Sequence, residues 1–181
     1  MDGQSLSVKE LDQGDITLVA DYWSQAEPHH LTGMGVDLSK LPSRDSFVKM
    51  LADQLKLPLN LRQSYCTIWL ANGQPIGHCN VNKVVFGREA YMHLHLWDAK
   101  RRHHGLGASL VRHSLKLFFS RLELEDLYCE PYALNPAPNA VLAKVGFTFV
   151  KRYRTVPGYI NFEQEVNLWH FSREQPARAI S

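Results

Sequence analysis

The chain has 181 residues, of which 45% are hydrophobic and 21% are charged, and its formal net charge is +2. This length and composition predict a single globular domain over residues 1–181, with enough apolar side chains for a substantial core. So small a net charge disfavours a nucleic-acid partner, because nucleic-acid-binding domains usually carry a broad basic face. No apolar run approaches the ~20 residues that cross a bilayer, so we expect no membrane partner.

The three cysteines, Cys66, Cys79 and Cys129, are an odd number without C-x-x-C spacing. Each lies in a strand-like segment, which favours free, buried thiols in a reducing compartment. The N-terminus has no charged-then-apolar signal pattern. We therefore expect a cytoplasmic protein, either a monomer or a homodimer.

Hydrophobic periodicity predicts helices and strands in an alternating order. Strands are expected at residues 5–11, 65–70, 75–84, 89–97, 125–132, 147–155 and 163–171. Helices are expected to begin at Asp15, at Ser43, after the glycines near residue 105, and at Asn139. The third helix presents apolar residues at helical spacing, namely Val111, Leu115, Phe118 and Leu122. Residues 27–36 are rich in Pro, Gly and His and are expected to form a loop.

The segment between the second and third expected strands contains Asn72-Gly73, the strongest short hairpin signal. The two flanking strands should therefore pair antiparallel. The next strand, residues 89–97, alternates between two kinds of side chain. Its odd positions are Tyr91, His93, His95 and Trp97, and its even positions are Met92, Leu94 and Leu96. The even face should be core, and the odd face can line a partly wet site.

Directly after this strand comes a basic, glycine-containing segment that leads into a helix. It contains Arg101, Arg102, His103, His104, Gly105, Leu106, Gly107 and Ala108. A helix start presents unpaired N–H groups and the positive end of the dipole, and glycines let a ligand approach the backbone. The segment lacks the Lys-Ser/Thr of a P-loop and the third glycine of the dinucleotide fingerprint. It predicts a site for a pyrophosphate.

A second motif lies about forty residues downstream. It reads Asn-Pro-Ala-Pro-Asn from Asn135 to Asn139 and ends in Lys-Val-Gly-Phe at Phe147. In this order and at this separation, the two motifs resemble those of the GNAT acyltransferases, which use acetyl-CoA. Within that superfamily, the second motif resembles the branch that acetylates the N-termini of ribosomal proteins and many small amines.

The resemblance implies an α/β fold of mixed α+β type. Its central mixed sheet is mostly antiparallel, with about seven strands, helices on both faces, and a split between the fourth and fifth strands. It also implies that acetyl-CoA binds at residues 101–108, Asn135 and Asn139, with the pantetheine arm in the split. An N–H near Leu96 would steady the oxyanion as the acetyl group passes directly to an amine acceptor.

The base is assigned to His93, because a family member, serotonin N-acetyltransferase, carries a catalytic His-x-His pair on the equivalent strand. His93 falls at the second position of that pair and Tyr91 at the first. A histidine base predicts that kcat/KM falls below about pH 6.5. The competitors are Glu163 and Glu165, since the N-terminal-acetylating branch can use a carboxylate late in its chain.

The chain departs from the family pattern at the group that protonates the departing thiolate. The position of the usual tyrosine is Leu142, and the position of the serine used by the N-terminal-acetylating branch is Pro138. Tyr128, Tyr132 or a water are the expected substitutes. A module that binds acyl-CoA without turnover, as a sensor or scaffold, is the alternative function. Binding of nucleic acid by residues 100–104 is a third.

Other chemistry is less favoured by the sequence. The histidine pairs at His29-His30, His93/His95 and His103-His104 invite a metal, but nothing in the sequence gathers three or four ligands, and we expect none. Cys129 as a nucleophile would need a base and exposure, whereas it falls in a predicted strand. The acceptor is expected to meet the 27–36 loop, where Glu27, His29 and His30 could contact an ammonium group, with Asp37 just beyond it.

Overall fold

The computed structural model describes residues 5–98, 100 and 105–174. Within these ranges seven strands form one sheet in the order β1-β2-β3-β4-β5-β7-β6. The strands are β1 (Leu6–Glu10), β2 (Tyr65–Ala71), β3 (Gln74–Val85), β4 (Glu89–Leu96), β5 (Asp126–Cys129), β6 (Thr148–Thr155) and β7 (Gln164–Ser172). The helices are α1 (Ile16–Gln25), α2 (Pro28–Gly33), α3 (Arg44–Lys56), α4 (Leu106–Arg121) and α5 (Pro136–Val145). The seven predicted strands are confirmed, and the four predicted helices correspond to α1, α3, α4 and α5.

Short 3-10 turns complete the chain, at η1 (Gln13–Asp15), η2 (Leu38–Lys40) and η3 (Leu59–Leu61). Two predictions need correction. The expected loop at 27–36 contains the short helix α2, which begins with Pro28 at a position where a missing N–H costs nothing. α5 begins at Pro136 rather than at Asn139, for the same reason.

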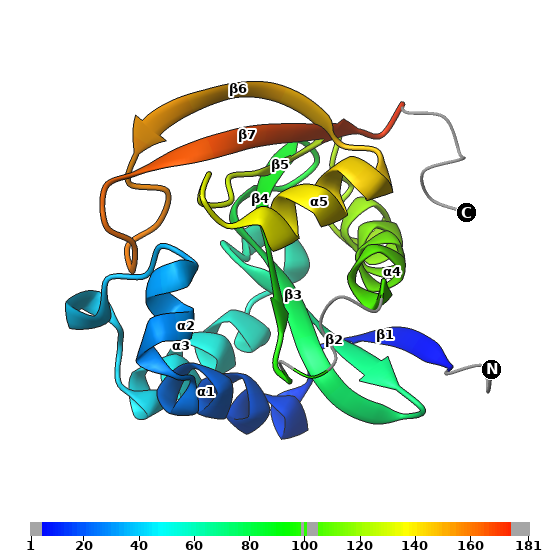
Figure 1. Cartoon of the computed structure of the whole chain (residues 1–181). Coiled ribbons are helices and arrows are strands. Elements are labelled where there is room, and N and C mark those ends of the chain that lie inside the picture. The colour runs from blue at the N-terminus through cyan, green and yellow to red at the C-terminus, as the bar shows by residue number, and fades with distance from the viewer. Residues whose placement is uncertain (1–4, 99, 101–104, 175–181) are drawn as a thin grey trace.

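Helices cover both faces of the sheet (Figure 1). α4 and α5 pack on one face, and the four apolar residues predicted for the inner side of α4 are all fully buried. α1, α2 and α3 form a second core with β2 on the other face. The predicted mixed sheet with helices on both faces is therefore confirmed. Within the described ranges, no helix combines the length and the hydropathy needed to cross a membrane.

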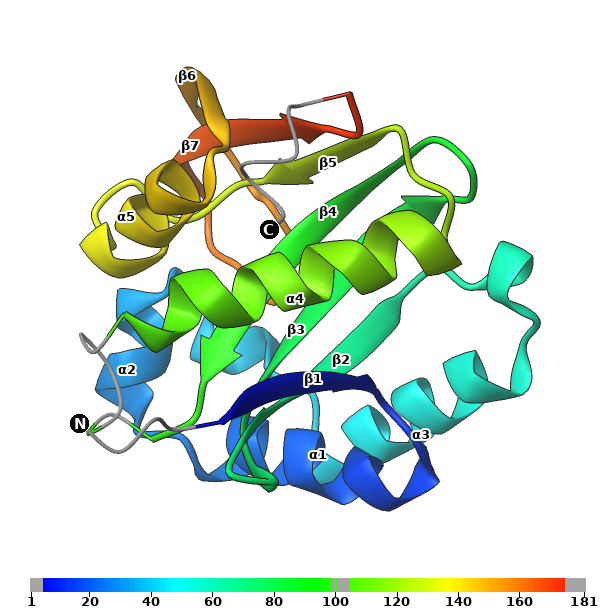
Figure 2. The same cartoon turned by 90° about the vertical axis from the view of Figure 1, so that its right-hand side faces the viewer.

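Hydrogen bonding between β4 and β5 is brief. All other neighbouring strands are antiparallel, but these two are parallel and pair over three positions only, from Glu89↔Asp126 to Tyr91↔Tyr128. Beyond them the strands diverge toward the N-terminal ends of α4 and α5 (Figure 2). The predicted split between the fourth and fifth strands is confirmed, and it opens the sheet near the start of α4.

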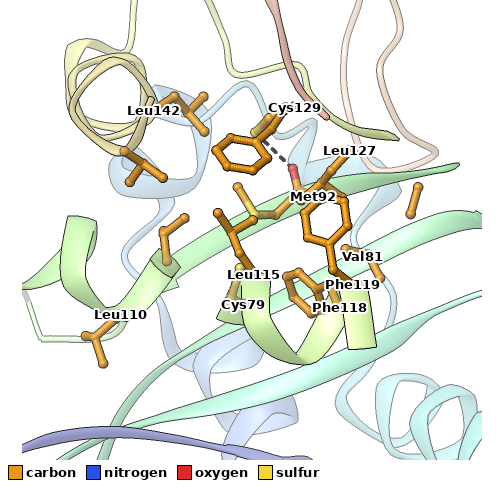
Figure 3. Packing of buried hydrophobic residues seen from close by; sticks show 14 of the residues in the cluster. Cys79, Val81, Met92, Leu110, Leu115, Phe118, Phe119, Leu127, Cys129 and Leu142 are labelled. Atoms are coloured by element: carbon orange, nitrogen blue, oxygen red, sulfur yellow. Dashed lines mark hydrogen bonds between the residues drawn. The ribbon is translucent and has the colours of Figure 1, made fainter. Parts of the chain in front are cut away.

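The base of the split is closed by Cys129. Its thiol donates a hydrogen bond to the Met92 carbonyl, with 3.0 Å between sulfur and oxygen (Figure 3). Cys129 and Met92 are both buried, and burial raises the pKa of the Cys129 thiol far above its usual value. The thiol therefore stays protonated at neutral pH, which agrees with a structural rather than a nucleophilic cysteine.

Candidate active site

Two cavities lie on opposite faces of β4. Leu94 and Leu96 line the first, which extends to the starts of α4 and α5 and has a volume of about 540 Å³. His93 lines the second, of about 530 Å³, which is walled by α1 and α3. His95 and Met34 line both. We call them the α4/α5 cavity and the α1/α3 cavity. The alternation predicted for this strand thus assigns one set of side chains to each cavity.

The start of α4 forms one end of the α4/α5 cavity. Gly105 caps the helix in the left-handed conformation, with φ +76°, where side chains are strained. Leu106, Gly107 and Ala108 follow in the first turn and line the cavity. The first N–H groups of a helix have no partner within it, and the dipole favours an anion there. This end of the cavity therefore fits a pyrophosphate.

Lys144 of α5 also reaches this end, a contact that the sequence did not reveal. A Cβ atom at Gly105 would lie 3.8 Å from the Lys144 ammonium nitrogen, and Lys144 lines the same cavity. Arg112 of α4 donates a hydrogen bond of 2.8 Å to the Lys144 carbonyl. The lysine stands inside the Lys-Val-Gly-Phe motif, but only the packing of α5 against α4 brings it to the glycines.

Gly107 makes that packing possible. A Cβ atom there would lie 3.3 Å from a methyl group of Val141, closer than most side chains tolerate. The absence of a side chain at Gly107 thus allows α4 and α5 to pack in contact. It also leaves the backbone open to a ligand. Arg101, Arg102, His103 and His104, the predicted basic part of the motif, lie outside the described residues.

Asn135 and Asn139 have different environments. Asn135 occupies the N-cap of α5 but makes no capping hydrogen bond with its side chain, and it lines the α4/α5 cavity. Asn139 donates to the carbonyls of Asn135 (2.7 Å) and Tyr132 (3.3 Å), and its oxygen accepts from Asn167 (2.8 Å) and Trp169 (2.9 Å). The Asn139 amide is thus occupied by hydrogen bonds within the protein and joins α5 to β7.

The two asparagines give a matched pair of variants. Asn135→Ala should weaken CoA binding about tenfold and leave the free energy of unfolding unchanged, because only a ligand contact is removed. Asn139→Ala should lower the free energy of unfolding by about 2 kcal/mol, because the Trp169 and Asn167 donors lose their acceptor. Calorimetry and urea denaturation measure the two effects. Lower stability with unchanged affinity in Asn135→Ala would contradict a cofactor contact.

A group of histidines lies between the two cavities. The rings of His78 and His95 stack, with centroids 4.6 Å apart, and the Trp97 indole donates a hydrogen bond of 2.8 Å to His78 Nδ1. The Tyr22 hydroxyl lies 3.4 Å from His95 Nδ1 and 3.3 Å from His30 Nε2. A chain of polar contacts therefore runs from the strand face to His30 on α2.

His78, His93 and His95 are neutral at physiological pH. Burial lowers the pKa of His78 to about 3. Burial, aided by the nearby positive charge of Lys83, lowers the pKa of His93 to about 4. Burial also lowers the pKa of His95 well below the usual value. The sequence predicted that kcat/KM falls below about pH 6.5. The buried imidazole of His93 lacks water to stabilise its charged form, so this fall should occur at a lower pH.

The lowered pKa values make the fold sensitive to acid. Below about pH 6.5 the unfolded chain binds protons at these histidines that the folded chain does not, so stability falls as the pH falls. For His78 alone the loss of folding free energy should be about 1 kcal/mol between about pH 6.5 and 5.5, because the unfolded histidine is half protonated at the start of this range. Urea unfolding across this range measures it. His78→Asn, which keeps an acceptor for Trp97, should flatten the pH dependence, and an unchanged slope would contradict this assignment.

The remaining expected residues lie away from both cavities. Tyr128 is stacked between Tyr91 and His170, with ring centroids 5.4 and 5.0 Å away. Tyr132 packs edge-on against Phe162. Neither tyrosine lines the α4/α5 cavity or the α1/α3 cavity.

The two expected carboxylate competitors are also remote. Glu163 and Glu165 are exposed, and Glu163 pairs with Arg154 at 2.8 Å. Of the acceptor-loop residues, His29 and His30 line the α4/α5 cavity, whereas Glu27 is exposed and Asp37 bonds Ser39. Within the described part of the chain, no three His, Cys, Asp or Glu side chains gather as metal ligands would.

The comparisons agree with this geometry. The family model described as Acetyltransferase (GNAT) domain matches residues 6–148. No curated protein sequence matches the chain. Similar solved structures include a ribosomal-protein-S5-alanine acetyltransferase from Vibrio fischeri (TM-score 0.76, 16% identity, covering 96% of this chain and 98% of that one).

Two further structures hold ligands. A spermidine N-acetyltransferase from Vibrio cholerae, in complex with CoA and spermine, has a TM-score of 0.75 at 14% identity, covering 94% of this chain and 96% of that one. An aminoglycoside acetyltransferase in complex with coenzyme A and kanamycin has a TM-score of 0.73 at 17% identity, covering 98% and 100%. These likenesses establish the shared fold. Since the family model spans most of the sequence, the chain belongs to the GNAT acetyltransferase family.

Proposed function

We propose that this protein is an N-acetyltransferase that moves an acetyl group directly from acetyl-CoA to a primary amine. The observation that carries the proposal is the pair of cavities that share β4 and meet at His95 and Met34. One cavity has a helix N-terminus and a lysine suited to a pyrophosphate, and the other has a deprotonated histidine. Acetyl-CoA and the amine, held on the two faces of β4, can meet at the split beside this strand. The acetyl group can then pass directly between them, without a covalent enzyme intermediate.

Acetyl-CoA supplies an activated acyl carbon when it is bound. In this proposal the N–H groups at the start of α4 and the Lys144 ammonium hold its phosphates. Leu94 and Leu96 line the split for the pantetheine arm. A backbone N–H near Leu96 donates to the carbonyl oxygen as negative charge develops on it.

His93 takes the proton that the amine loses as its nitrogen bonds to the carbonyl carbon. Burial lowers the pKa of both partners in this transfer. It keeps His93 neutral, and a cavity poor in water also lowers the pKa of the alkylammonium group of the acceptor. His93 then releases the proton to solvent. No covalent acyl-enzyme is required, in line with the protonated, buried state of Cys129.

The thiolate leaving group needs a proton donor at the α4/α5 cavity. Tyr22 is better placed for this role than Tyr128 or Tyr132, because it lines that cavity. Its hydroxyl would give its proton to the sulfur and regain one through His30, which lies 3.3 Å away and is partly exposed. We also assign the protein to the cytoplasm, where its three free cysteines would stay reduced.

The test is to measure acetyl-CoA binding by calorimetry and thiol release with a panel of primary amines, confirming acetylated products by mass spectrometry. Transfer to one or more amines is the expected result. Failure to bind acetyl-CoA would overturn the proposal. Binding without transfer to any amine would instead identify an acyl-CoA sensor or scaffold.

A further inference from the structure

The walls of the α1/α3 cavity are mostly apolar. Trp23 of α1 and Phe47 of α3 stack face to face, with ring centroids 5.6 Å apart and planes 9° apart, and both line the cavity. Val36 and Ile160 line it as well. A flat, apolar wall of this kind holds the carbon skeleton of a ligand by excluding water.

The rim of the same cavity is also apolar, although it faces solvent. Met50 on α3 is 43% exposed and Tyr159, in the segment between β6 and β7, is 58% exposed. The Tyr159 hydroxyl lies 3.8 Å from the Met50 sulfur, so the two side chains meet at the rim. Large apolar side chains that gather at the opening of a cavity are typical of a binding site for an apolar ligand.

The cavity offers little negative charge. Among its described lining residues the one carboxylate is Asp53, which is held by Lys49 at 2.5 Å and Lys56 at 3.0 Å. Lys83 adds positive charge near the floor, where its ammonium bonds the Pro157 carbonyl at 3.0 Å. A ligand with several ammonium groups would therefore find no unpaired carboxylate to replace the water it loses.

The floor carries two polar atoms that the protein leaves unsatisfied. Asn82 Oδ1 and His93 Nε2 are buried and have no hydrogen-bond partner in the described part of the chain. Both residues line the cavity. In the β3–β4 register Asn80 faces His93 and Asn82 faces Tyr91, so Asn82 and His93 are diagonal neighbours on one face of the sheet.

A buried polar atom without a hydrogen-bond partner destabilises the protein, and a ligand that donates a hydrogen bond to it removes this cost. An amide oxygen accepts hydrogen bonds, and a neutral imidazole accepts at the nitrogen that carries no proton. A primary amine has the N–H groups to serve both acceptors at once. The remaining lining then contacts the carbon skeleton behind the nitrogen.

We propose that the α1/α3 cavity selects a primary monoamine on an aliphatic or aromatic skeleton, whose nitrogen donates to Asn82 Oδ1 and His93 Nε2. The proposal rests on the function proposed above and names its acceptor class. It separates this chain from the structural neighbours that were crystallised with spermine and with kanamycin, both of which carry several amino groups. Asn82 is thereby a specificity-determining residue on a strand that the sequence motifs do not touch.

The sharpest test compares two acceptors of equal length, hexylamine and hexamethylenediamine, with phenethylamine, spermidine and kanamycin as further probes. The monoamines should have a kcat/KM at least about tenfold higher than the diamine, because the second ammonium must be buried without a partner. Parallel calorimetry of the CoA-bound protein with each amine gives a readout that does not depend on turnover.

Two variants of Asn82 extend the test. Asn82→Ala should raise KM for hexylamine about tenfold while the Kd of acetyl-CoA, which binds on the other face of β4, stays constant. Asn82→Asp supplies the missing carboxylate and should shift the preference toward the diamine. Equal Kd values for acetyl-CoA in parent and variants show that the fold is preserved.

The outcomes separate the two proposals. If the parent prefers hexamethylenediamine, spermidine or kanamycin, the acceptor class is wrong while the acetyltransferase function stands. If the parent binds monoamines but transfers no acetyl group, the acceptor class stands and the function is wrong. If Asn82→Ala leaves both KM and amine affinity unchanged, Asn82 does not contact the acceptor.

Discussion

Gly105→Asp is expected to reduce the affinity for acetyl-CoA on the order of 100-fold, or about 2.7 kcal/mol. The substitution places a carboxylate at the start of α4, where the pyrophosphate is expected, and where a Cβ atom would lie 3.8 Å from Lys144. A negative charge there repels the phosphates and occupies the Lys144 ammonium. Calorimetry with CoA measures the effect.

Two matched variants show which effect of the Gly105→Asp substitution weakens CoA binding: its charge, its side-chain volume, or the backbone strain at a positive φ. Gly105→Asn has nearly the same shape as Gly105→Asp without the charge, so the difference between the two measures the electrostatic part. Gly87 has a similar conformation, with φ +74°, and a Cβ atom there would meet nothing within 4 Å. Gly87→Asp should therefore bind CoA like the parent. A folded Gly105→Asp protein that binds CoA as tightly as the parent would show that the phosphates lie elsewhere.

His93→Gln is expected to lower kcat/KM for a monoamine by roughly 100-fold, the usual contribution of a general base. Its Kd for acetyl-CoA should not change, because His93 lines only the α1/α3 cavity. Glu163→Gln serves as the control, since this exposed carboxylate pairs with Arg154 and should leave the rate unchanged. Full activity in His93→Gln would exclude this histidine as the base.

The pH profile gives a second check on the same residue. Because burial and Lys83 lower the pKa of His93 to about 4, protonation should remove the base only near that pH. Once kcat/KM is expressed per unprotonated amine, it should be flat from about pH 7 to 5.5 and fall toward 4. Lys83→Gln should move this fall to higher pH, because one cause of the lowered pKa is removed. A fall centred near pH 6.5 in the parent would indicate a solvated base instead.

The parts of the fold that could be predicted from the sequence were those that depend on local patterning. The alternation in residues 89–97 assigned His93 and Leu94 to opposite faces, and the two cavities bear this out. The Asn72-Gly73 turn, with φ of 51° and 74°, was readable because few residues adopt this conformation. α2 was missed, since Pro28 and Gly33 suggest breaks even though they stand at the two ends of a single helix.

The unpredicted parts of the site depend on contacts between distant segments. Lys144 reaches the α4 start only because α5 packs against Gly107, and Asn139 is occupied only because β7 supplies Trp169. The pKa of His93 could not be predicted either, because it depends on burial beneath α1 and α3. Likewise, Asn82 lies in no motif, and its unpaired oxygen becomes visible only when the cavity around it is known.

The alternation along β4 also bears on how such a protein diverges. Substitutions at position 93 change the α1/α3 cavity, whereas those at positions 94 and 96 change the α4/α5 cavity. With the function proposed above, a lineage can therefore acquire a new acceptor through odd positions of β4 while it retains its acetyl donor through the even positions. His95 is the exception, because it lines both cavities, and a mutation there alters both of them in one step.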